Sequence, residues 1–243
     1  MKNVLITGAS SGVGKALAIH LSKQYSVIAL ARRKQVMDKN FKSHDNISSY
    51  EVDISDKDTL DRVLDSILED HGTISYLINN AGVMVAEGLE DLPLETLEQS
   101  IHINALAPLD IMKKLIHGMK KDNFGRIINM TSGAPLNCFP GYGAYSASKA
   151  LLNALTVTFA RELESLNIKI NLMSPGPVKS EMAPDGPMDA SVCFPTVDYL
   201  LSDSEGVNTG KFYWLGYEVP LFPDLEGVQW LEGIGNEKLR KIL

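Results

Sequence analysis

Tyr145 and Lys149 lie four positions apart, and this spacing makes them the side chains best suited to handle a proton together. Residues at i and i+4 lie on one face of a helix, so the phenol and the ammonium can point into one site. Ser132 precedes this pair and follows an apolar run at 126–130 that is typical of a strand, so its hydroxyl is expected at a strand end. A tyrosine and a lysine at this spacing also occur by chance on helix surfaces. The elements around them therefore decide whether the three groups meet.

The first elements of the chain predict an alternating strand and helix unit. An apolar run at 4–7 is typical of a buried strand, a helical stripe begins at Val13, and a second apolar run occupies 26–31. The turn between the first strand and the helix reads T-G-x-x-x-G-x-G over residues 7–14. Glycines allow a tight bend there, and a helix N-terminus favours an anion such as a pyrophosphate. A tight turn without a ligand is the alternative, but its place after a strand favours a dinucleotide site.

Two arginines, Arg32 and Arg33, come directly after the second predicted strand. In dinucleotide-binding folds an acidic residue at this place holds the ribose 2′-hydroxyl, whereas an arginine accommodates a 2′-phosphate. The chain has Ala31 and then Arg32 here, with no acid, and a guanidinium suits a phosphate. We therefore predict NADP(H) as the cofactor, with NAD(H) less favoured. Two solvent-exposed arginines without a ligand are the alternative.

Polar and small residues follow the next two predicted strands. Asp53 comes after a strand at 46–52, and the sequence Asn-Asn-Ala-Gly at 79–82 comes after a strand at 76–78. Ligands of open parallel sheets bind at the carboxyl ends of the strands, so both segments are candidates for contact with a cofactor. Between them, residues 55–58 have the pattern of a capping box with Ser55 as its first residue, which predicts a helix start.

A long helix is predicted over 94–120, and it contains Asn104 and Pro108. Proline has no N–H to donate to the carbonyl four residues earlier, which here belongs to Asn104. We expect a kink at this point and a free carbonyl whose simplest partner is an ordered water. A kink without a function is the alternative.

A second long helix is predicted over 143–166, and it carries the Tyr145 and Lys149 pair. Its apolar residues cover more than one side, which indicates deep burial or contact with another subunit. A strand at 168–173, a helix at 195–202 and a strand at 210–215 follow. The segment 181–195 is predicted to be a substrate loop, and 216–243 an atypical C-terminal tail. By position alone, the candidates for a substrate pocket are Ala134, Leu136, Phe139, Tyr142, Met182 and Cys193, which core packing would explain equally well.

Taken in order, these motifs resemble the short form of the short-chain dehydrogenase/reductase family. The resemblance is carried by the segments 7–14 and 79–82, by Ser132 with Tyr145 and Lys149, and by the Pro-Gly pair at 175–176. It implies an α/β fold in which 1–243 forms a single dinucleotide-binding domain. That domain would be a Rossmann-like, doubly wound parallel sheet of about seven strands flanked by helices. It also implies a homodimer or a homotetramer.

The functional positions of the family fall on particular residues of this sequence. A catalytic tetrad is implied at Asn104, Ser132, Tyr145 and Lys149. Cofactor contacts are implied at Gly8, Ser10, Ser11, Gly12, Val13, Gly14, Arg32, Arg33, Asp53, Ile54, Asn80, Ala81, Gly82, Tyr145, Lys149, Pro175, Gly176, Val178 and Ser180. There are two departures: Ser11 stands where NADP-dependent members often carry a basic residue, and the chain after residue 210 does not follow the family's common ending.

The resemblance implies reversible hydride transfer between the nicotinamide of NADP(H) and a carbonyl carbon. Tyr145 would donate the proton, and Lys149 with an oxidised nicotinamide would lower its pKa from an ordinary value of about 10. Ser132 would polarise the carbonyl, and a water held by Asn104 would return the proton through Lys149. The favoured function is an NADP(H)-dependent carbonyl reductase or alcohol dehydrogenase.

Three other functions are open to different degrees. Dehydrogenation of a sugar, sterol-like or polyketide alcohol belongs to the same class and shares all of these motifs. A sensor that binds NADP(H) without turnover is disfavoured because the tetrad is intact. A sugar-nucleotide epimerase is disfavoured by the spacing of the glycine turn and by a C-terminal part too short for a separate substrate domain.

Composition argues against several classes of partner. The 243 residues carry a net charge of −7, which disfavours a nucleic-acid surface. The five histidines are scattered and the two cysteines show no paired spacing, so we expect neither a metal site nor a disulfide. No run of about 18 apolar residues occurs, and the apolar start is too short for a signal segment. We therefore expect a cytoplasmic protein that acts on a small molecule and has no membrane partner.

Overall fold

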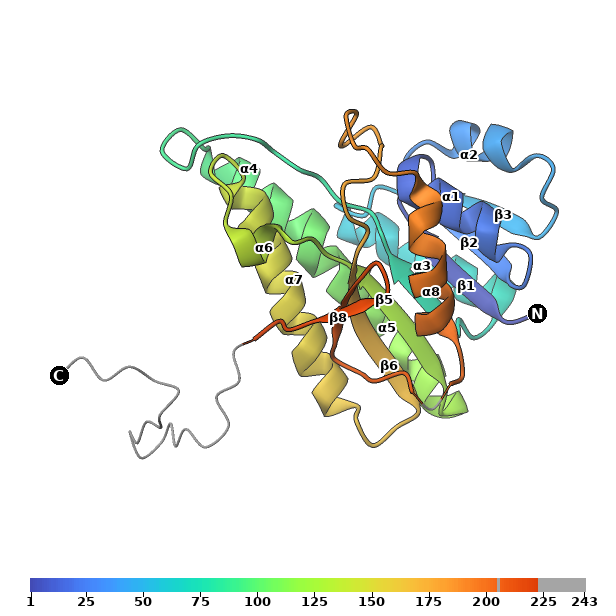
Figure 1. Cartoon of the computed structure of the whole chain (residues 1–243). Coiled ribbons are helices and arrows are strands. Elements are labelled where there is room, and N and C mark those ends of the chain that lie inside the picture. The colour runs from blue at the N-terminus through green and yellow to red at the C-terminus, as the bar shows by residue number, and fades with distance from the viewer. Residues whose placement is uncertain (205, 223–243) are drawn as a thin grey trace.

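Within the residues that the structure describes, eight strands form one sheet, in the order β3-β2-β1-β4-β5-β6-β7-β8 (Figure 1). The computed structural model describes residues 1–204 and 206–222. Neighbouring strands from β3 to β7 pair in parallel, and β8 runs antiparallel to β7. The strands are β1 (Asn3–Thr7), β2 (Ser26–Ala31), β3 (Ile47–Glu51), β4 (Tyr76–Asn79), β5 (Gly125–Met130), β6 (Ile168–Ser174), β7 (Phe212–Trp214) and β8 (Tyr217–Val219).

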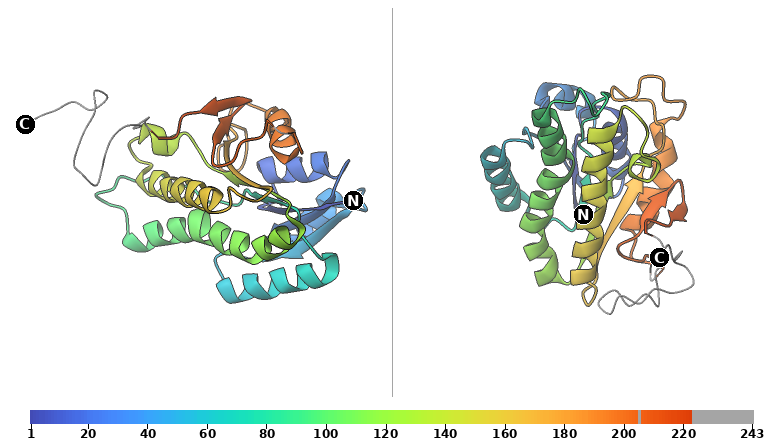
Figure 2. Two further views of the ribbon diagram at one scale, coloured as in Figure 1. Left: turned by 90° about the horizontal axis from the view of Figure 1, so that it is seen from below. Right: turned by 90° about the vertical axis from the view of Figure 1, so that its left-hand side faces the viewer.

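Helices cover both faces of this sheet (Figure 2). On one face the buried core includes α1 (Gly12–Leu21), α2 (Lys34–Phe41) and α8 (Phe194–Leu201). On the other face it includes α3 (Lys57–His71), α5 (Ala107–Asp122) and the end of α7 (Gly143–Glu162). The short elements are α4 (Leu94–Ile101), the π-helix η1 (His102–Leu106), α6 (Ala134–Asn137) and the 3-10 helix η2 (Ala190–Cys193).

Burial on both faces explains why the central strands are continuous apolar runs rather than alternating ones. Every residue of β4 and of β5 is buried, and so are four of the five residues of β1. This arrangement confirms the predicted α/β class with a doubly wound, mostly parallel sheet.

The sheet has one strand more than the roughly seven that were predicted, because β8 lies in the segment interpreted as an atypical tail. Leu215 and Gly216 both have positive φ, 46° and 82°, and form the two-residue turn between β7 and β8. Such a turn suits the twist of an antiparallel hairpin. Trp230, which the sequence also places in the tail, lies outside the described residues.

Two local predictions about helices need correction. The N-cap of α3 is Asp56, whose carboxylate accepts the N–H of Thr59, whereas Ser55 donates its hydroxyl and its N–H to Asp53. The helix therefore begins with an aspartate cap one residue after the predicted start, because the side chain of Ser55 is hydrogen-bonded to Asp53 and does not cap the helix.

The predicted helix over 94–120 consists of three consecutive segments, α4, η1 and α5, rather than one kinked α-helix. Pro108 lies in the first turn of α5, where a missing N–H is tolerated. Proline removes one N–H donor from the helix. The π-helix before it accommodates this loss, because its hydrogen bonds span one residue more than those of an α-helix. Within the described residues, no helix is both long and apolar enough to cross a membrane.

Candidate active site

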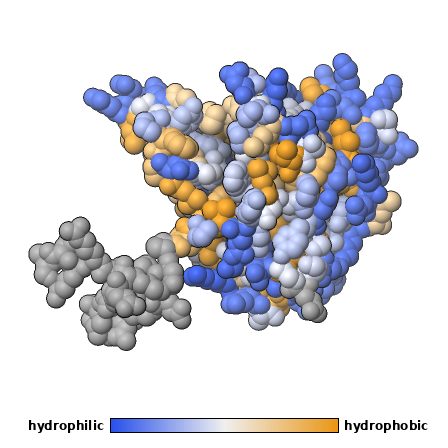
Figure 3. All heavy atoms as spheres, viewed as in Figure 1, coloured by the Kyte–Doolittle hydropathy of each residue, from blue (hydrophilic) through white to orange (hydrophobic). Residues whose placement is uncertain are grey.

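A cavity of about 1090 Å³ opens at the carboxyl ends of the parallel strands. Most of its lining comes from the ends of β2, β5 and β6, from the segments that follow β1 to β6 and from the starts of α1 and α7, and β7, β8 and η1 complete it. A crevice is expected here because β1 and β4 are neighbours, while the chain between them builds the sheet outward on the other side. Figure 3 shows a hollow between the side that carries α6 and α7 and the loop that follows β6, with apolar residues along it.

The turn after β1 packs so closely against the loop after β4 that two of its glycines leave no room for a side chain. Gly8 has a φ of +69°, and a Cβ on it would come 2.8 Å from the Cα of Ala81. A Cβ on Gly14 would come 2.5 Å from both the side-chain nitrogen of Asn80 and the carbonyl oxygen of Gly8. Asn80 holds the turn in place, because its Nδ2 donates to the carbonyl oxygens of Thr7 (3.0 Å) and Gly8 (3.4 Å).

Gly14→Ala should therefore displace the Asn80 side chain and loosen the turn. We expect the free energy of unfolding to fall by about 1–3 kcal/mol, the usual effect of overpacking a tight interior. Chemical denaturation measures this, with Gly88→Ala as the control because a Cβ on Gly88 would meet nothing within 4 Å. Equal unfolding free energies for the two variants would show that the close packing at Gly14 does not contribute to stability.

The start of α1 presents backbone N–H groups to this cavity. Ser11 is the N-cap of α1 and, within the described residues, makes no side-chain cap hydrogen bond. The first N–H groups of the helix are therefore open to an anionic ligand. Thr7, which was not predicted as a site residue, supports the turn: its Oγ1 accepts the N–H groups of Asn80 and Ala81, both at 3.0 Å. The signals for this role in the sequence were its place at the end of the first strand and at the start of the glycine motif.

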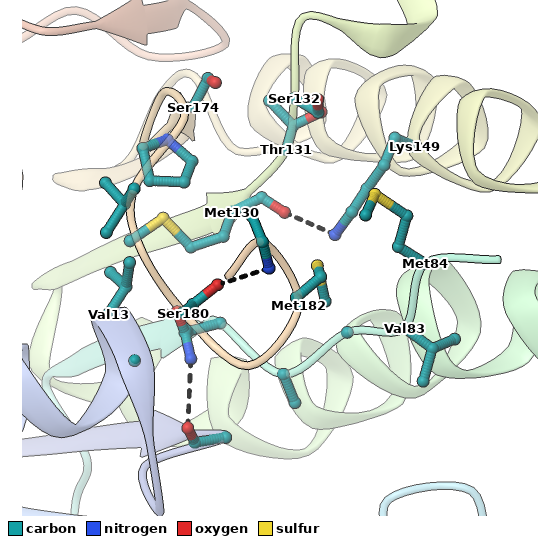
Figure 4. Close-up of a pocket in the computed structure, with 18 of the residues that line it drawn as sticks. Val13, Val83, Met84, Met130, Thr131, Ser132, Lys149, Ser174, Ser180 and Met182 are labelled. Carbon is teal, nitrogen blue, oxygen red and sulfur yellow. Dashed lines mark hydrogen bonds between the residues drawn. The ribbon is translucent and has the colours of Figure 1, made fainter. Parts of the chain in front are cut away.

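α7 brings Tyr145 and Lys149 to the cavity wall, and Ser132 follows β5 beside them. The Lys149 ammonium donates a 2.7 Å hydrogen bond to the carbonyl of Met130 (Figure 4). Its Nζ lies 5.9 Å from the centre of the Tyr145 ring. The Ser132 hydroxyl interacts with the Tyr145 phenol and accepts the N–H of Ala134 at 3.1 Å. The three groups whose meeting was in question therefore share one wall.

Burial controls the protonation of both titratable groups. It lowers the pKa of Lys149 from 10.5 to about 8, since the side chain is almost fully enclosed. It raises the pKa of Tyr145, an effect that the Ser132 hydroxyl partly offsets. In the protein alone the ammonium is turned to the Met130 carbonyl, and desolvation of the phenol has the larger effect on the Tyr145 pKa. The expected lowering, to which an oxidised nicotinamide would contribute, stays a prediction.

Asn104 lies in η1, behind the cavity wall rather than on it. Its Oδ1 accepts the N–H of Val83 at 2.8 Å, and its Nδ2 donates to the Val83 carbonyl and to the Ser148 hydroxyl, both at 2.9 Å. These contacts tie the loop after β4 to α7, so Asn104 positions the wall that carries the cavity. The water-holding role of its own carbonyl stays a prediction.

The two arginines after β2 have different surroundings. Arg33 donates to the hydroxyls of Ser10 (3.1 Å) and Ser11 (3.0 Å) on the glycine turn, and it pairs with Glu181 at 2.9 Å. The side chain of Arg32 is 73% exposed, and its Nη1 lies 4.0 Å from Oδ2 of Asp53. Both guanidinium groups border the cavity, but Arg33 is the one that side-chain hydrogen bonds hold in place.

A family model for short chain dehydrogenases matches residues 2–189 of this chain. The chain belongs to the short-chain dehydrogenase family.

Individual members of the family resemble it over most of its length. It is 30% identical over 186 residues to the 3-oxoacyl-[acyl-carrier-protein] reductase FabG of Thermotoga maritima, covering 74% of this chain and 76% of that protein. It is 31% identical over 184 residues to the NAD-dependent glycerol dehydrogenase of Listeria innocua, covering 74% and 72%. The structure of ElxO with NADP bound matches with a TM-score of 0.81 at 27% identity, covering 88% of this chain and 97% of that one.

In this short-chain dehydrogenase, the predicted site residues come together at one cavity with two exceptions. Gly14 and Asn104 lie directly behind the wall, and all the other predicted catalytic and cofactor-binding residues line it. They arrive there from six strand ends, which explains why residues as distant in the sequence as Gly8 and Ser180 become neighbours. Within the described residues, no group of three His, Cys, Asp or Glu side chains is arranged to hold a metal ion.

Two of the predicted substrate-pocket residues of this chain lie elsewhere. Cys193 is fully buried in the core below α8, where burial raises its pKa to about 11. Tyr142 precedes α7 without lining the cavity. Both errors arose because position along the chain does not tell which way the segment before a helix turns its side chains.

The cavity is polar at one end and apolar at the other. Its charged lining residues gather at the glycine turn, apart from the enclosed Lys149. Large apolar side chains are exposed at the opposite end, namely Leu136, Phe139, Met182 and Trp214. Trp214 was missed as a lining residue, because the strand that carries it becomes a neighbour of the site only through its pairing with β6.

Proposed function

We propose that this short-chain dehydrogenase transfers a hydride between the nicotinamide of NADP(H) and a carbonyl or secondary alcohol, with Tyr145 as acid and base. The observation that supports this best is the meeting of Tyr145, Lys149 and Ser132 on one wall of the cavity that the glycine turn also borders. The names of the relatives, a 3-oxoacyl reductase and a glycerol dehydrogenase, agree with chemistry at a carbonyl or an alcohol carbon.

The shape of the cavity suits a dinucleotide. The close packing at Gly8 and Gly14 leaves backbone rather than side chains beside the open start of α1, where a pyrophosphate would be held. A Cβ on Gly82 would come 3.5 Å from the Lys149 Nζ, so glycine keeps space free beside the ammonium. NADPH bound here would supply the hydride to the carbonyl carbon of the substrate.

The side chains of the protein handle the oxygen of the substrate. In the reducing direction, the O–H bond of Tyr145 breaks and its proton moves to the oxygen that becomes the alcohol. The Ser132 hydroxyl donates a hydrogen bond to the same oxygen and stabilises the negative charge that develops on it. Lys149 carries a proton at neutral pH, since its pKa is about 8. Together with the oxidised nicotinamide, its charge would favour the phenolate that remains after the proton has moved.

The choice of NADP(H) rests on the arginines. Arg32→Ala should weaken binding of NADPH by about 10- to 100-fold, the effect of losing hydrogen bonds to a charged group. Binding of NADH should change by less than about twofold, because its ribose lacks the phosphate that the guanidinium would hold. Fluorescence titration of both cofactors measures this, with the exposed Arg62→Ala as a control for loss of a surface charge. An equal loss for both cofactors would remove the phosphate role from Arg32.

Oxidation of NADPH in the presence of a panel of aldehydes and ketones tests the proposed reaction. Turnover of at least one compound supports the oxidoreductase. Tight binding of NADPH with no turnover of any carbonyl, and none of any alcohol with NADP⁺, would favour the NADP(H) sensor instead. The apolar end of the cavity makes uncharged, bulky ketones the compounds to try first.

We also propose that the protein is cytoplasmic, that it forms a homodimer or a homotetramer, and that residues 1–243 form one catalytic domain. The described part of the chain agrees with a single domain, because one sheet carries every strand end at the cavity. Light scattering on the purified full chain measures the number of subunits.

A further inference from the structure

Glu181 places a carboxylate on the donor groups that the 2′-phosphate of NADP(H) would use. Arg33 donates from Nη1 to Oε1 (3.1 Å) and from Nη2 to Oε2 (2.9 Å) of Glu181, which is a two-point ion pair. The same guanidinium holds the hydroxyls of Ser10 and Ser11. The Arg33 guanidinium and the Ser11 hydroxyl keep the pKa of Glu181 below its usual range, so this carboxylate is charged at neutral pH.

The position of Glu181 is set by a tight turn in the loop after β6. The Ser180 N–H donates to the Ala183 carbonyl at 3.0 Å, and the Ala183 N–H donates to the Ser180 hydroxyl at 3.1 Å (Figure 4). The turn lies on the glycine turn, since a Cβ on Gly12 would come 3.2 Å from the Ser180 Cβ. Its second tip residue, Met182, lines the cavity (Figure 4). One short turn therefore connects the arginine end of the cavity to a side chain of its apolar end.

A carboxylate and a phosphate cannot share one guanidinium without repulsion. The 2′-phosphate carries more charge than the carboxylate and has three acceptor oxygens, so it would displace Glu181 rather than bind beside it. A cofactor without the phosphate would leave the Arg33 ion pair intact. The cavity thus contains a competitor for one of the two cofactors only.

We propose that Glu181 sets the cofactor selectivity of this chain by competing with the 2′-phosphate of NADP(H) for Arg33, Ser10 and Ser11. This rests on the proposed function, which takes a nicotinamide dinucleotide as the ligand of the cavity. Glu181 narrows the preference for NADP(H) over NAD(H).

Isothermal titration of the full chain with NADP⁺ and with NAD⁺ tests the competition. Glu181→Gln should tighten NADP⁺ about 3- to 30-fold, the range for removal of an exposed charge pair and of a nearby like charge. The Kd for NAD⁺ should change by less than about twofold. Asp185→Asn is the matched control, because Asp185 is an exposed acid of the same loop that does not line the cavity. In an Arg33→Ala background, the gain from Glu181→Gln should disappear.

Each other outcome overturns part of the argument. Equal tightening of both cofactors, or the same tightening in Asp185→Asn, would mean that only the net charge of the loop matters. Weaker NAD⁺ binding in Glu181→Gln would mean that the carboxylate serves the ribose 2′-hydroxyl instead. Wild-type binding of NADP⁺ with no gain in Glu181→Gln overturns this inference alone. Absence of binding of either dinucleotide, in wild type and variant, overturns the proposed cofactor as well.

Discussion

Tyr145→Phe should lower kcat by roughly 10²–10⁴-fold, the usual loss when a positioned acid is removed. The substitution deletes only the phenolic oxygen, so the ring still fills its place on the cavity wall beside Ser132. Because the backbone of the glycine turn is untouched, the Kd for NADP⁺ should stay within about twofold. Steady-state kinetics with the best carbonyl substrate and a binding titration measure the two effects separately.

The control for this variant is Tyr199→Phe in α8, which removes a phenol that donates to the carbonyl of Gly206 and does not line the cavity. Its turnover should equal that of the wild type. Burial raises the pKa of Tyr145, so the phenol keeps its proton through neutral pH and carbonyl reduction should weaken only toward alkaline pH. Near-normal turnover in Tyr145→Phe would assign the proton to another group.

Lys149→Met should abolish most of the turnover and yet make the protein more stable below pH 8. The folded protein encloses this lysine and lowers its pKa from 10.5 to about 8, so holding the ammonium in the fold costs free energy. One pKa unit corresponds to about 1.4 kcal/mol, which makes this cost roughly 3 kcal/mol in the wild type at neutral pH. Methionine fills a similar volume without a charge.

The sign of the pH dependence follows from proton linkage. Between pH 8 and pH 10.5 the unfolded lysine binds more protons than the folded one, so the contribution of Lys149 to stability rises with pH. The stability advantage of Lys149→Met is therefore largest below pH 8 and should shrink by most of about 3 kcal/mol by pH 10.

Urea denaturation of both proteins across this range measures the difference in unfolding free energy. Titratable groups that both proteins share contribute equally and cancel. Lys113→Met, at an exposed position of α5, is the control for loss of a lysine charge. If the difference in unfolding free energy stays constant from pH 7 to pH 10, the fold does not lower the pKa of Lys149.

Local features of the chain were predictable because they depend on neighbours in the sequence. The pairing of Tyr145 with Lys149 follows from helical spacing, and the glycine turn follows from a strand that meets glycine directly. The break near Pro108 was also predictable, since proline always removes one donor. Its form, a π-helix rather than a kink, depends on how Asn104 packs against Val83 and Ser148, which local spacing does not contain.

The predictions that failed depend on contacts between distant parts of the chain. Cys193 lies in the core and Trp214 lies at the cavity because of how α8 and β7 pack on the sheet. The pKa of Tyr145 in the protein alone also depends on such contacts. In the fold the Lys149 ammonium is turned to the Met130 carbonyl, and burial raises the pKa of the phenol.

By itself, the sequence determined the α/β class, the order of the elements and the residue types that approach one cavity. Periodicity and turn chemistry act over a few residues, and they are written directly in the chain. Only the tertiary structure decided which charges meet inside that cavity. Arg33 and Glu181 are separated by most of the chain, and they form an ion pair because the loop after β6 folds back onto the glycine turn after β1. A pairing of this kind depends on which strands are neighbours in the sheet, and no local pattern in the sequence encodes it.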